Sequence, residues 1–263
     1  MLNQSLDFPM VSAHSLSTTI RRPSLARLRP HPELLFFVGA YLLYIGARWV
    51  FAGDPRTAIE HAQWIVGLER STHVAIEASV QGALSAPVVS WLLSNVYLAA
   101  QLVVLPGALI LLYRRARPIY RRLRTTVIAT WMIAVPIHGL WPVAPPRLSG
   151  LGIRDTVSAQ IVPLSGHSTI FYNAFAAVPS LHVGFAFAVS FALAAALQAR
   201  WAKALVLLWG PLVTVAVIAT GNHFVFDAVA GLVVTLAGFT AGSLLPRVRF
   251  RRHSGSHPAL ATI

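Results

Sequence analysis

Two histidines and one aspartate stand where long apolar runs begin. His182 follows Pro179 and Ser180 at the start of one run, and His223 and Asp227 open another. Titratable side chains at a membrane boundary are costly to keep there, so their presence is a functional hypothesis by default. An imidazole can act as nucleophile, base or acid near neutral pH. The pattern therefore predicts imidazole chemistry at the edge of a membrane.

His223 and Asp227 are four residues apart, which places them on one face of a helix. A carboxylate there can bond one nitrogen of the His223 ring and leave the other as an oriented lone pair. This spacing predicts His223 as nucleophile or base and Asp227 as its orienter. Two alternatives stay open: the pair could be structural, and a single membrane histidine is often only a hydrogen-bonded interface residue.

Several neighbours of these histidines are suited to binding phosphate. Pro179 and Ser180 are typical of a helix start, with a fixed φ and a capping hydroxyl, and Asn222 is a candidate cap for the run after it. Free amides at helix starts attract phosphate, aided by the helix dipole. Arg147, after Pro146, is expected on the same face as a cationic clamp, although it could simply extend to lipid headgroups.

The elements that must position these side chains are membrane-spanning helices. Hydrophobic residues make up 56% of the 263 residues and charged residues only 11%, against roughly 25% charged in soluble domains. There is no cysteine, which excludes disulfides and thiolate metal sites. We expect an all-α polytopic membrane protein, a six-transmembrane-helix bundle, with spans near residues 34–52, 88–112, 125–142, 180–198, 204–221 and 224–245.

The distribution of basic residues gives this bundle an orientation. Most of the 21 lysines and arginines lie in the tails 1–33 and 247–263 and in the loops after the second and fourth spans. The positive-inside rule then places both termini in the cytoplasm and the two histidines on the outer face of a plasma membrane. The net charge of +13 is assigned to topology and anionic lipid rather than to nucleic acid.

Two long outer loops, 53–87 and 143–179, interrupt the membrane domain 34–246. In the first, Ile76, Val80 and Leu84 recur at helical spacing, which predicts an amphipathic helix on the membrane surface. The second is rich in Pro, Ser and Gly and ends at Pro179. Loops of this length without obvious structure are usually functional or disordered.

Three segments resemble the type 2 phosphatidic acid phosphatase superfamily, and more closely its branch of inositol phosphorylceramide synthase-like proteins. Residues 173–184 (NAFAAVPSLHVG) resemble the second motif of that branch, and residues 221–231 (GNHFVFDAVAG) resemble the third. Residues 142–147 (PVAPPR) are similar to the stretch that precedes them. The resemblance covers about residues 54–245, including the six-span count.

The resemblance implies a role for each histidine. The third-motif histidine of the family attacks phosphorus and forms a phosphohistidine, which would make His223 the nucleophile and Asp227 the group that orients its ring. The second-motif histidine, here His182, would protonate the leaving oxygen and then act as base. Water or another alcohol would resolve the intermediate, with no metal and no cofactor. Positive groups would stabilise the phosphoryl oxygens.

The sequence departs from the family pattern at two places. The usual first motif, a lysine followed seven residues later by Arg-Pro, is absent in that form. Arg117-Pro118 is similar, but its loop is expected in the cytoplasm, so Arg147 is the better clamp. The usual arginine six residues before the third-motif histidine is Val217, and Thr220 and Asn222 could replace it as neutral phosphate-binding donors.

Three further residues of the second outer loop are candidates for substrate contact. Residues 163–167 (PLSGH) mimic the phosphatase motif Pro-Ser-Gly-His, but Leu164 is inserted and no helix start follows, so His167 is a decoy or a loop contact. Arg154 and Asp155 are the other two candidates.

We therefore expect a metal-independent membrane lipid phosphatase or phosphotransferase with an outward-facing site. It would act on a phospholipid or on an isoprenoid or sphingolipid-type phosphate, with water, an alcohol or a headgroup as acceptor. One alternative is a metal-dependent hydrolase, since His182, His223 and Asp227 are suitable zinc ligands. The other is a non-catalytic lipid-binding protein that uses Arg147 to hold headgroups. The sequence leaves the lipid, the acceptor and the oligomeric state open.

Overall fold

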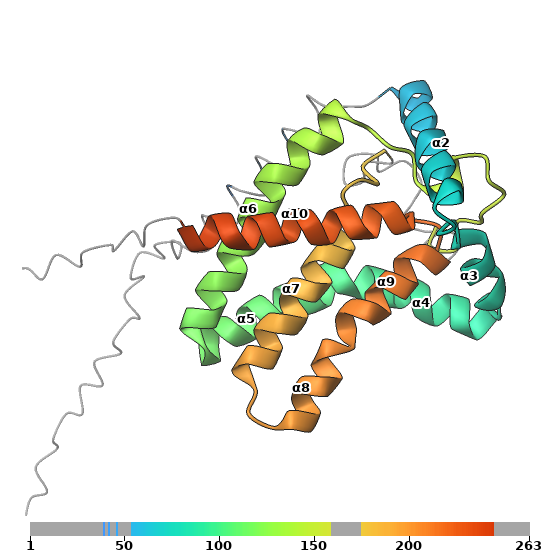
Figure 1. Ribbon diagram of the computed structural model, residues 1–263. Coiled ribbons are helices and arrows are strands. Elements are labelled where there is room, and N and C mark those ends of the chain that lie inside the picture. The colour runs from blue at the N-terminus through green and yellow to red at the C-terminus, as the bar shows by residue number, and fades with distance from the viewer. Residues whose placement is uncertain (1–38, 40–41, 43–45, 47–53, 159–174, 245–263) are drawn as a thin grey trace, which may run out of the picture. The chain divides into compact units, whose positions relative to one another are not determined.

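The computed structural model describes residues 54–158 and 175–244, together with Gly39, Leu42 and Gly46. In these ranges the regular structure is helical, and an isolated parallel bridge joins Val143 to Ala176 (Figure 1). Apart from the three single residues, the expected first span 34–52 lies outside the described residues. Both basic tails and His167 also lie outside them.

Within the described residues, four helical segments are long and apolar enough to cross a membrane, judged by length and composition. They are Pro87–Arg115, which joins α4 (Pro87–Ala99), a π-helical turn (Ala100–Val104) and α5 (Leu105–Arg115); α6 (Arg117–Leu140); Arg200–Ala219, which joins α8 (Arg200–Leu207) and α9 (Trp209–Ala219); and α10 (Val225–Leu244).

The remaining expected span is α7 (Leu181–Ala196), a shorter apolar helix. Its 16 residues reach about 24 Å at ~1.5 Å per residue, which is less than the ~30 Å hydrocarbon core of a bilayer. The all-helical fold is thus confirmed, whereas the count of six spans is not.

The basic segment expected as a loop after the second span is helical instead. Only Ala116, with φ −147° and ψ 66°, separates α5 from α6. Pro118 lies in the first turn of α6, where its missing amide costs nothing, and arginine is a good helix former. The arginines therefore extend the helix ends: Arg114, Arg115, Arg117, Arg121, Arg122 and Arg124.

The first of the two long loops, expected from sequence on the outer side, contains two helices, α2 (Pro55–Ser71) and α3 (Glu77–Ala83). Asp54 caps α2 by accepting a hydrogen bond from the Thr57 amide at 2.9 Å. Val80 and Leu84 of the predicted amphipathic stripe pack on Leu93, in α4, and on α9. These two residues of the stripe therefore serve packing within the protein, while Ile76 remains exposed.

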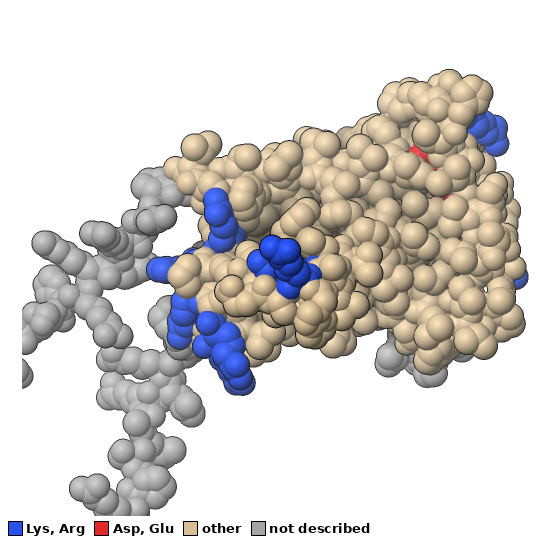
Figure 2. Space-filling view, turned by 60° about the horizontal axis from the view of Figure 1, so that its bottom comes forward, with Lys and Arg blue, Asp and Glu red and all other residues tan. Residues whose placement is uncertain are grey.

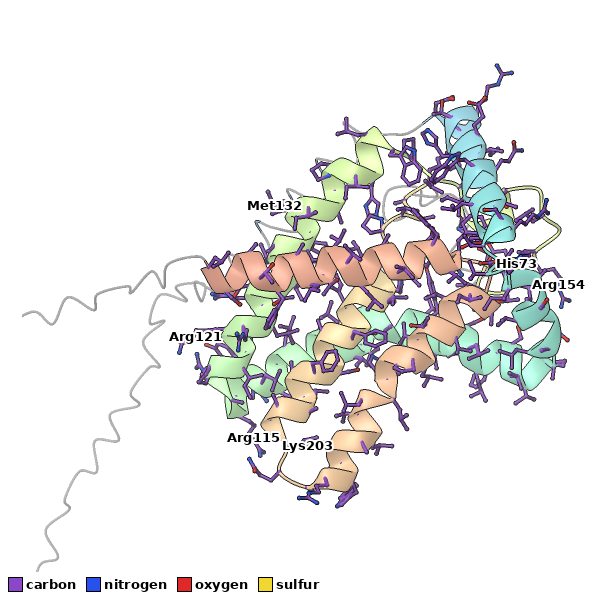
Figure 3. The ribbon with its side chains drawn as sticks, viewed as in Figure 1. His73, Arg115, Arg121, Met132, Arg154 and Lys203 are labelled. Carbon is purple, nitrogen blue, oxygen red and sulfur yellow. The ribbon has the colours of Figure 1, made fainter. Side chains whose placement is uncertain are left out.

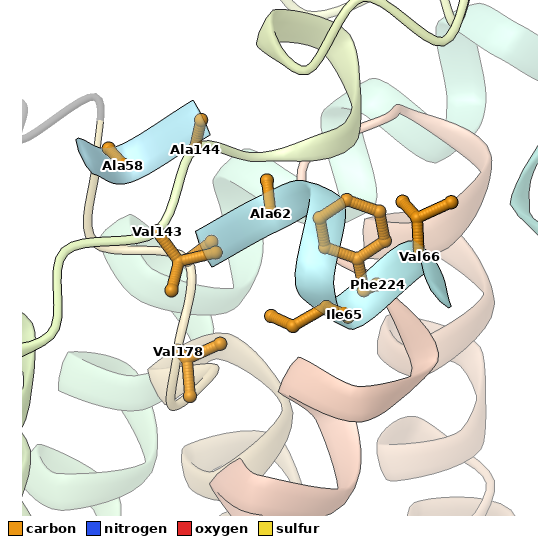
Figure 4. Packing of buried hydrophobic residues seen from close by; sticks show 9 residues of the cluster. Ala58, Ala62, Ile65, Val66, Val143, Ala144, Val178 and Phe224 are labelled. Atoms are coloured by element: carbon orange, nitrogen blue, oxygen red, sulfur yellow. The ribbon is translucent and has the colours of Figure 1, made fainter. Parts of the chain in front are cut away.

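Helix α2 covers the segments that lead into and out of the spanning helices. Its buried side chains, such as Ile65, pack with Val143, Val178 and Phe224 (Figure 4). The amide of Ala144 also donates to the carbonyl of Ala58 at 2.9 Å. One outer helix thus holds together the chain after α6, the chain before α7 and the turn before α10.

Small residues let α10 approach α6 and α7 closely. A Cβ added at Gly231 would overlap the carbonyl of Ser180, and one added at Gly238 would overlap Thr130 of α6. Large apolar residues such as Leu102 and Leu236 are more than half exposed on the other faces. This is the distribution expected of helices that face lipid on one side and each other on the other.

Charged residues separate between the two ends of the helices. Figure 2 shows lysines and arginines gathered over one end. In Figure 3, Arg115, Arg121 and Lys203 are at one end, while His73 and Arg154 are at the other. The described acidic residues belong to α2 with its cap, to α3, to the loop after α6 or to the start of α10: Asp54, Glu60, Glu69, Glu77, Asp155 and Asp227.

Candidate active site

The structure brings His182 and His223 together from segments 41 positions apart. Their ring centroids are 5.9 Å apart. His182 is in the first turn of α7, and His223 lies in the turn between α9 and α10. The Ser180 amide donates to the Asp227 carbonyl at 3.0 Å, so the start of α7 is tied directly to the first turn of α10. The two histidine motifs thus lie side by side, as the sequence predicts.

The partners of the His223 ring determine which nitrogen can react. Its Nδ1 lies 3.0 Å from the carbonyl oxygen of Ala177 and 3.3 Å from Oδ2 of Asp227. A carbonyl can only accept a hydrogen bond, so Nδ1 carries the proton and donates it. In the neutral ring, Nε2 then holds a lone pair. This is the orientation predicted from the His223–Asp227 spacing, with the Ala177 carbonyl as an additional partner.

The environment of His223 keeps its ring neutral. The residue lies in the turn outside the spanning helices and is buried. Burial, together with the positive charge of Arg147, lowers the pKa of His223 to about 3. At neutral pH the contact with Asp227 is therefore a hydrogen bond from a neutral imidazole, and the lone pair on Nε2 is available for reaction.

His182 stacks on Tyr97 of α4. The two ring centroids are 4.1 Å apart and the ring planes meet at 18°. Tyr97 is itself buried, so it holds one face of the His182 ring in place. The sequence analysis did not include Tyr97, because one tyrosine within an apolar run carries no pattern that links it to a distant histidine.

Arg147 reaches the site through the 3-10 turn Pro146–Leu148, which directly follows the segment after α6. Its amide donates to the Gly221 carbonyl at 3.0 Å, and its buried Nε donates to Oδ2 of Asp155 at 2.9 Å. Asp155 therefore orients the Arg147 guanidinium, a role different from the substrate contact expected for it.

The exclusion of Arg117 from the site is also confirmed. Arg117 begins α6, whereas the site lies beyond the end of that helix. The 24 residues of α6 separate the two ends by about 36 Å at ~1.5 Å per residue.

Ser180 is the N-cap of α7, as its position after Pro179 predicts. Its Oγ accepts a hydrogen bond from the Val183 amide at 3.4 Å, and the residue is fully buried. The structure thus shows Ser180 in a capping role at the base of the His182 helix.

Asn222 and Thr220 stabilise the end of α9 instead of the start of α10. Asn222 donates from Nδ2 to the Thr220 hydroxyl at 2.9 Å, and that hydroxyl donates to the carbonyl of Ala216 at 2.7 Å. The prediction that Asn222 caps the last helix is therefore wrong. The two side chains close the turn before His223.

Three successive amides at the start of α10 are already bonded within the protein, whereas the sequence suggested free amides for phosphate. The amides of Phe224, Val225 and Phe226 donate to carboxylates of Asp227, Glu77 and Glu69, respectively. Two of these three donors are held by Glu77 of α3 and Glu69 of α2, a contact between distant segments that the local sequence does not reveal.

Gln81 of α3 is a second residue that the sequence analysis missed. Its Nε2 donates to the carbonyls of Arg154 and Ala219, at 2.9 and 3.0 Å, and its Oε1 accepts from the Arg154 amide at 2.8 Å. Gln81 thereby ties the Arg147 loop to the end of α9. Arg154 contributes its backbone to this link, and its side chain is exposed.

His138 is a third histidine near the site; it is buried in the last turn of α6. Its Nε2 lies 3.2 Å from the carbonyl oxygen of Pro179. Because the carbonyl can only accept, Nε2 carries the proton. His138 thus holds the segment that leads into Ser180. The described residues contain no group of three or more His, Cys, Asp or Glu side chains arranged to hold a metal ion.

The fold and site define a helical membrane protein with two neighbouring histidines at one end of its helices. Residues 63–241 match the PAP2 superfamily, and the chain belongs to that superfamily. The crystal structure of LpxE from Aquifex aeolicus is similar, with a TM-score of 0.48 and 15% sequence identity; the match covers 64% of this chain and 92% of that one. No curated protein matches the chain. The expected superfamily is thus confirmed, whereas the inositol phosphorylceramide synthase-like branch stays a prediction.

Proposed function

We propose that this protein is a membrane lipid phosphatase or phosphotransferase that works through a phosphohistidine on His223. The observation that carries the proposal is the hydrogen bonding of the His223 ring. Nδ1 is held by Ala177 and Asp227, which leaves the lone pair on Nε2, and the centroid of the His182 ring lies 5.9 Å from that of the His223 ring. Membership of the PAP2 superfamily supports a lipid phosphate as the substrate class.

In the first step, Nε2 of His223 attacks phosphorus and forms an N–P bond. The bond from phosphorus to the lipid oxygen breaks, and His182 donates a proton to that oxygen. Asp227 stabilises the positive charge that develops on the His223 ring. Arg147, oriented by Asp155 and close enough to His223 to affect its pKa, supplies positive charge to the phosphoryl oxygens.

In the second step, His182 takes a proton from the incoming hydroxyl. The oxygen of that hydroxyl attacks phosphorus, and the N–P bond breaks, which returns His223 to its neutral form. Water as the acceptor gives hydrolysis, and an alcohol gives transfer. Of these two outcomes, the resemblance to inositol phosphorylceramide synthase-like proteins favours transfer of a headgroup to an alcohol.

The charge distribution supports an outward-facing site. Gln81 ties the backbone of Arg154 to the end of α9, next to the His223 turn, and Arg154 lies at the end of the molecule opposite Arg115, Arg121 and Lys203 (Figure 3). With the basic end in the cytoplasm, the site faces the outer side of a plasma membrane.

Trapping the phosphoenzyme tests this function. Purified full-length protein in detergent micelles is incubated with phosphatidic acid, and in parallel with farnesyl phosphate, each carrying a radioactive phosphate, and is quenched with alkali. We expect label on His223 in the wild type and none in His223→Ala. Turnover without a labelled histidine would contradict the mechanism.

Two further arms separate the alternatives. Loss of turnover in a strong chelator, with recovery on added zinc, would identify a metal-dependent hydrolase. Lipid binding without release of phosphate, unchanged between the wild type and His223→Ala, would identify a lipid-binding protein.

A further inference from the structure

Three carboxylates hold the three successive backbone amides at the start of α10. The Phe224 amide donates to Asp227 Oδ2 at 2.8 Å, the Val225 amide to Glu77 Oε1 at 3.0 Å, and the Phe226 amide to Glu69 Oε1 at 2.7 Å. Amides in the first turn of a helix have no partner within the helix. Here each has a carboxylate, and two of the three carboxylates come from other helices.

The turn between α2 and α3 brings Glu69 and Glu77 to the same place. Glu69 lies near the end of α2 and Glu77 is the first residue of α3. Between them, His73 has a φ of 59°, a left-handed conformation that is uncommon for a residue with a side chain. The chain reverses there, and both side chains become buried, with 2% and 4% of their surface exposed.

Burying these groups has a cost that their hydrogen bonds only partly offset. Among the described residues, Oε2 of Glu69 and Oδ1 of Asp227 are buried without a hydrogen-bond partner. Burial, with the nearby carboxylates of Glu77 and Asp227, raises the pKa of Glu69 to about 8. Glu69 is therefore mostly neutral at pH 7. Residues of this kind are rarely buried unless they are paired, so their position points to a role beyond packing.

That role follows from what the first turn of α10 carries. Asp227 uses a single oxygen, Oδ2, for both the Phe224 amide and the His223 ring. Any fraying of the turn would move the carboxylate and the ring together. A misplacement of about 1 Å in reacting groups can lower a rate by ~10²-fold. Two carboxylates on separate outer helices resist that fraying from outside the reacting pair.

We propose that Glu69 and Glu77 are positioning residues for phosphoryl transfer: they clamp the first turn of α10 and so fix His223 and Asp227 for attack. This inference rests on the proposed function. Neither glutamate needs to touch the substrate, and what each supplies is an acceptor oxygen for one amide. A glutamine at either position keeps that oxygen, whereas an alanine removes it.

The test compares Glu69→Ala, Glu77→Ala, Glu69→Gln and Glu77→Gln with the wild type. Glu60→Ala is the matched control, because Glu60 lies on the same α2 helix with an exposed side chain. The measurements are kcat and KM with radiolabelled phosphatidic acid in mixed micelles, and hydrogen exchange of peptides that contain residues 224–226. All variants are made in the full-length protein.

We expect both alanine variants to lose about tenfold or more in kcat, with KM changed by less than about threefold. Both glutamine variants should retain most of the kcat, and exchange at residues 224–226 should be faster only in the alanine variants. Glu60→Ala should match the wild type in every measurement.

Three results would overturn the inference. One is faster exchange in the alanine variants with an unchanged kcat, which would make the contacts structural only. Another is an equal loss in the alanine and glutamine variants, which would show that the role needs the carboxyl group itself and not only an acceptor oxygen. A wild-type protein that releases no phosphate from either lipid would overturn the proposed function itself, and this inference with it.

Discussion

At the scale of single residues, the site separates the group that reacts from the groups that orient it. The proposed nucleophile His223 has both its orienting partners on Nδ1, and the proposed acid His182 is fixed by the face of Tyr97. Arg147 is fixed in turn by Asp155, whose Oδ1 accepts from the amides of Val157 and Ser158. The loop thus orients the guanidinium before any substrate arrives.

Removing the Arg147 side chain should weaken substrate binding more than it slows chemistry. A hydrogen bond to a charged group contributes about 1.5–3 kcal/mol, so we expect Arg147→Ala to raise KM for phosphatidic acid by roughly tenfold or more. Asp155→Asn should produce a smaller change in the same direction, since the loop stays in place. Steady-state kinetics of the purified variants measure both effects.

The control for this series is Arg56→Ala, because Arg56 is an exposed arginine on α2. It removes the same charge and should leave KM unchanged. A fall in kcat at constant KM in Arg147→Ala would contradict the prediction, because it would assign the guanidinium to the transition state alone.

At the scale of elements, the outer helices and α10 make the site by contact. Helix α2 packs over the segments next to the histidines, and α3 ties the Arg147 loop to α9 through Gln81. The two histidine motifs were predictable because each is a short local pattern. Their position at the same end of the helices was predictable from the distribution of basic residues. The Glu69, Gln81 and Tyr97 contacts were not, since each joins segments far apart in sequence.

The same reasoning explains the predictions that failed at this scale. Asn222 has the residue type of a helix cap, and its side chain bonds backward to Thr220. The amides it was expected to cap are held by Glu69 and Glu77 from other helices. Residue propensity therefore predicted the polar turn before α10 correctly, but it predicted the wrong hydrogen-bond partners for Asn222.

The buried carboxyl of Glu69 predicts a pH dependence of stability. Its pKa is raised from 4.5 to about 8 by folding, so between these values the folded chain keeps a proton that the unfolded chain has lost. Stability then falls as pH rises through this window. Glu69→Gln removes the titration, and its stability advantage over the wild type should grow from about pH 5 to about pH 8.

Thermal unfolding in detergent at several pH values measures this difference. Glu60→Ala, which changes an exposed carboxylate on the same helix, should follow the wild-type profile. Parallel profiles for Glu69→Gln and the wild type would show that Glu69 titrates alike in both states, and the prediction would be wrong.

Gly231 should be essential to the distance between the two histidines. A Cβ at this position would overlap the Ser180 carbonyl at the cap of α7, and α7 would have to move away from α10. We expect Gly231→Ala to reduce turnover of phosphatidic acid by more than about tenfold. Gly107→Ala on α5 is the control, because nothing lies within 4 Å of the added Cβ. Wild-type turnover in Gly231→Ala would refute this view of the packing.

At the scale of the whole molecule, charge and site occupy opposite ends of the helices. Seven of the eight boundaries expected for the four long spans agree with the described helices to within four residues, because apolar length is a strong signal. The basic ends were wrongly predicted as loops, since arginine both marks topology and favours helix. The proposed orientation in the membrane follows from the distribution of basic residues, and labelling from one side of the membrane can test it.

The absence of cysteine from the sequence makes the orientation directly testable. Ser85, between α3 and α4, and Gln198, between α7 and α8, are exposed and lie toward opposite ends of the helices. With the basic end in the cytoplasm, a membrane-impermeant maleimide should label Ser85→Cys in intact cells. Gln198→Cys should be labelled only after permeabilisation, and the wild type never. The reverse pattern would place the histidines in the cytoplasm and exclude an outward-facing site.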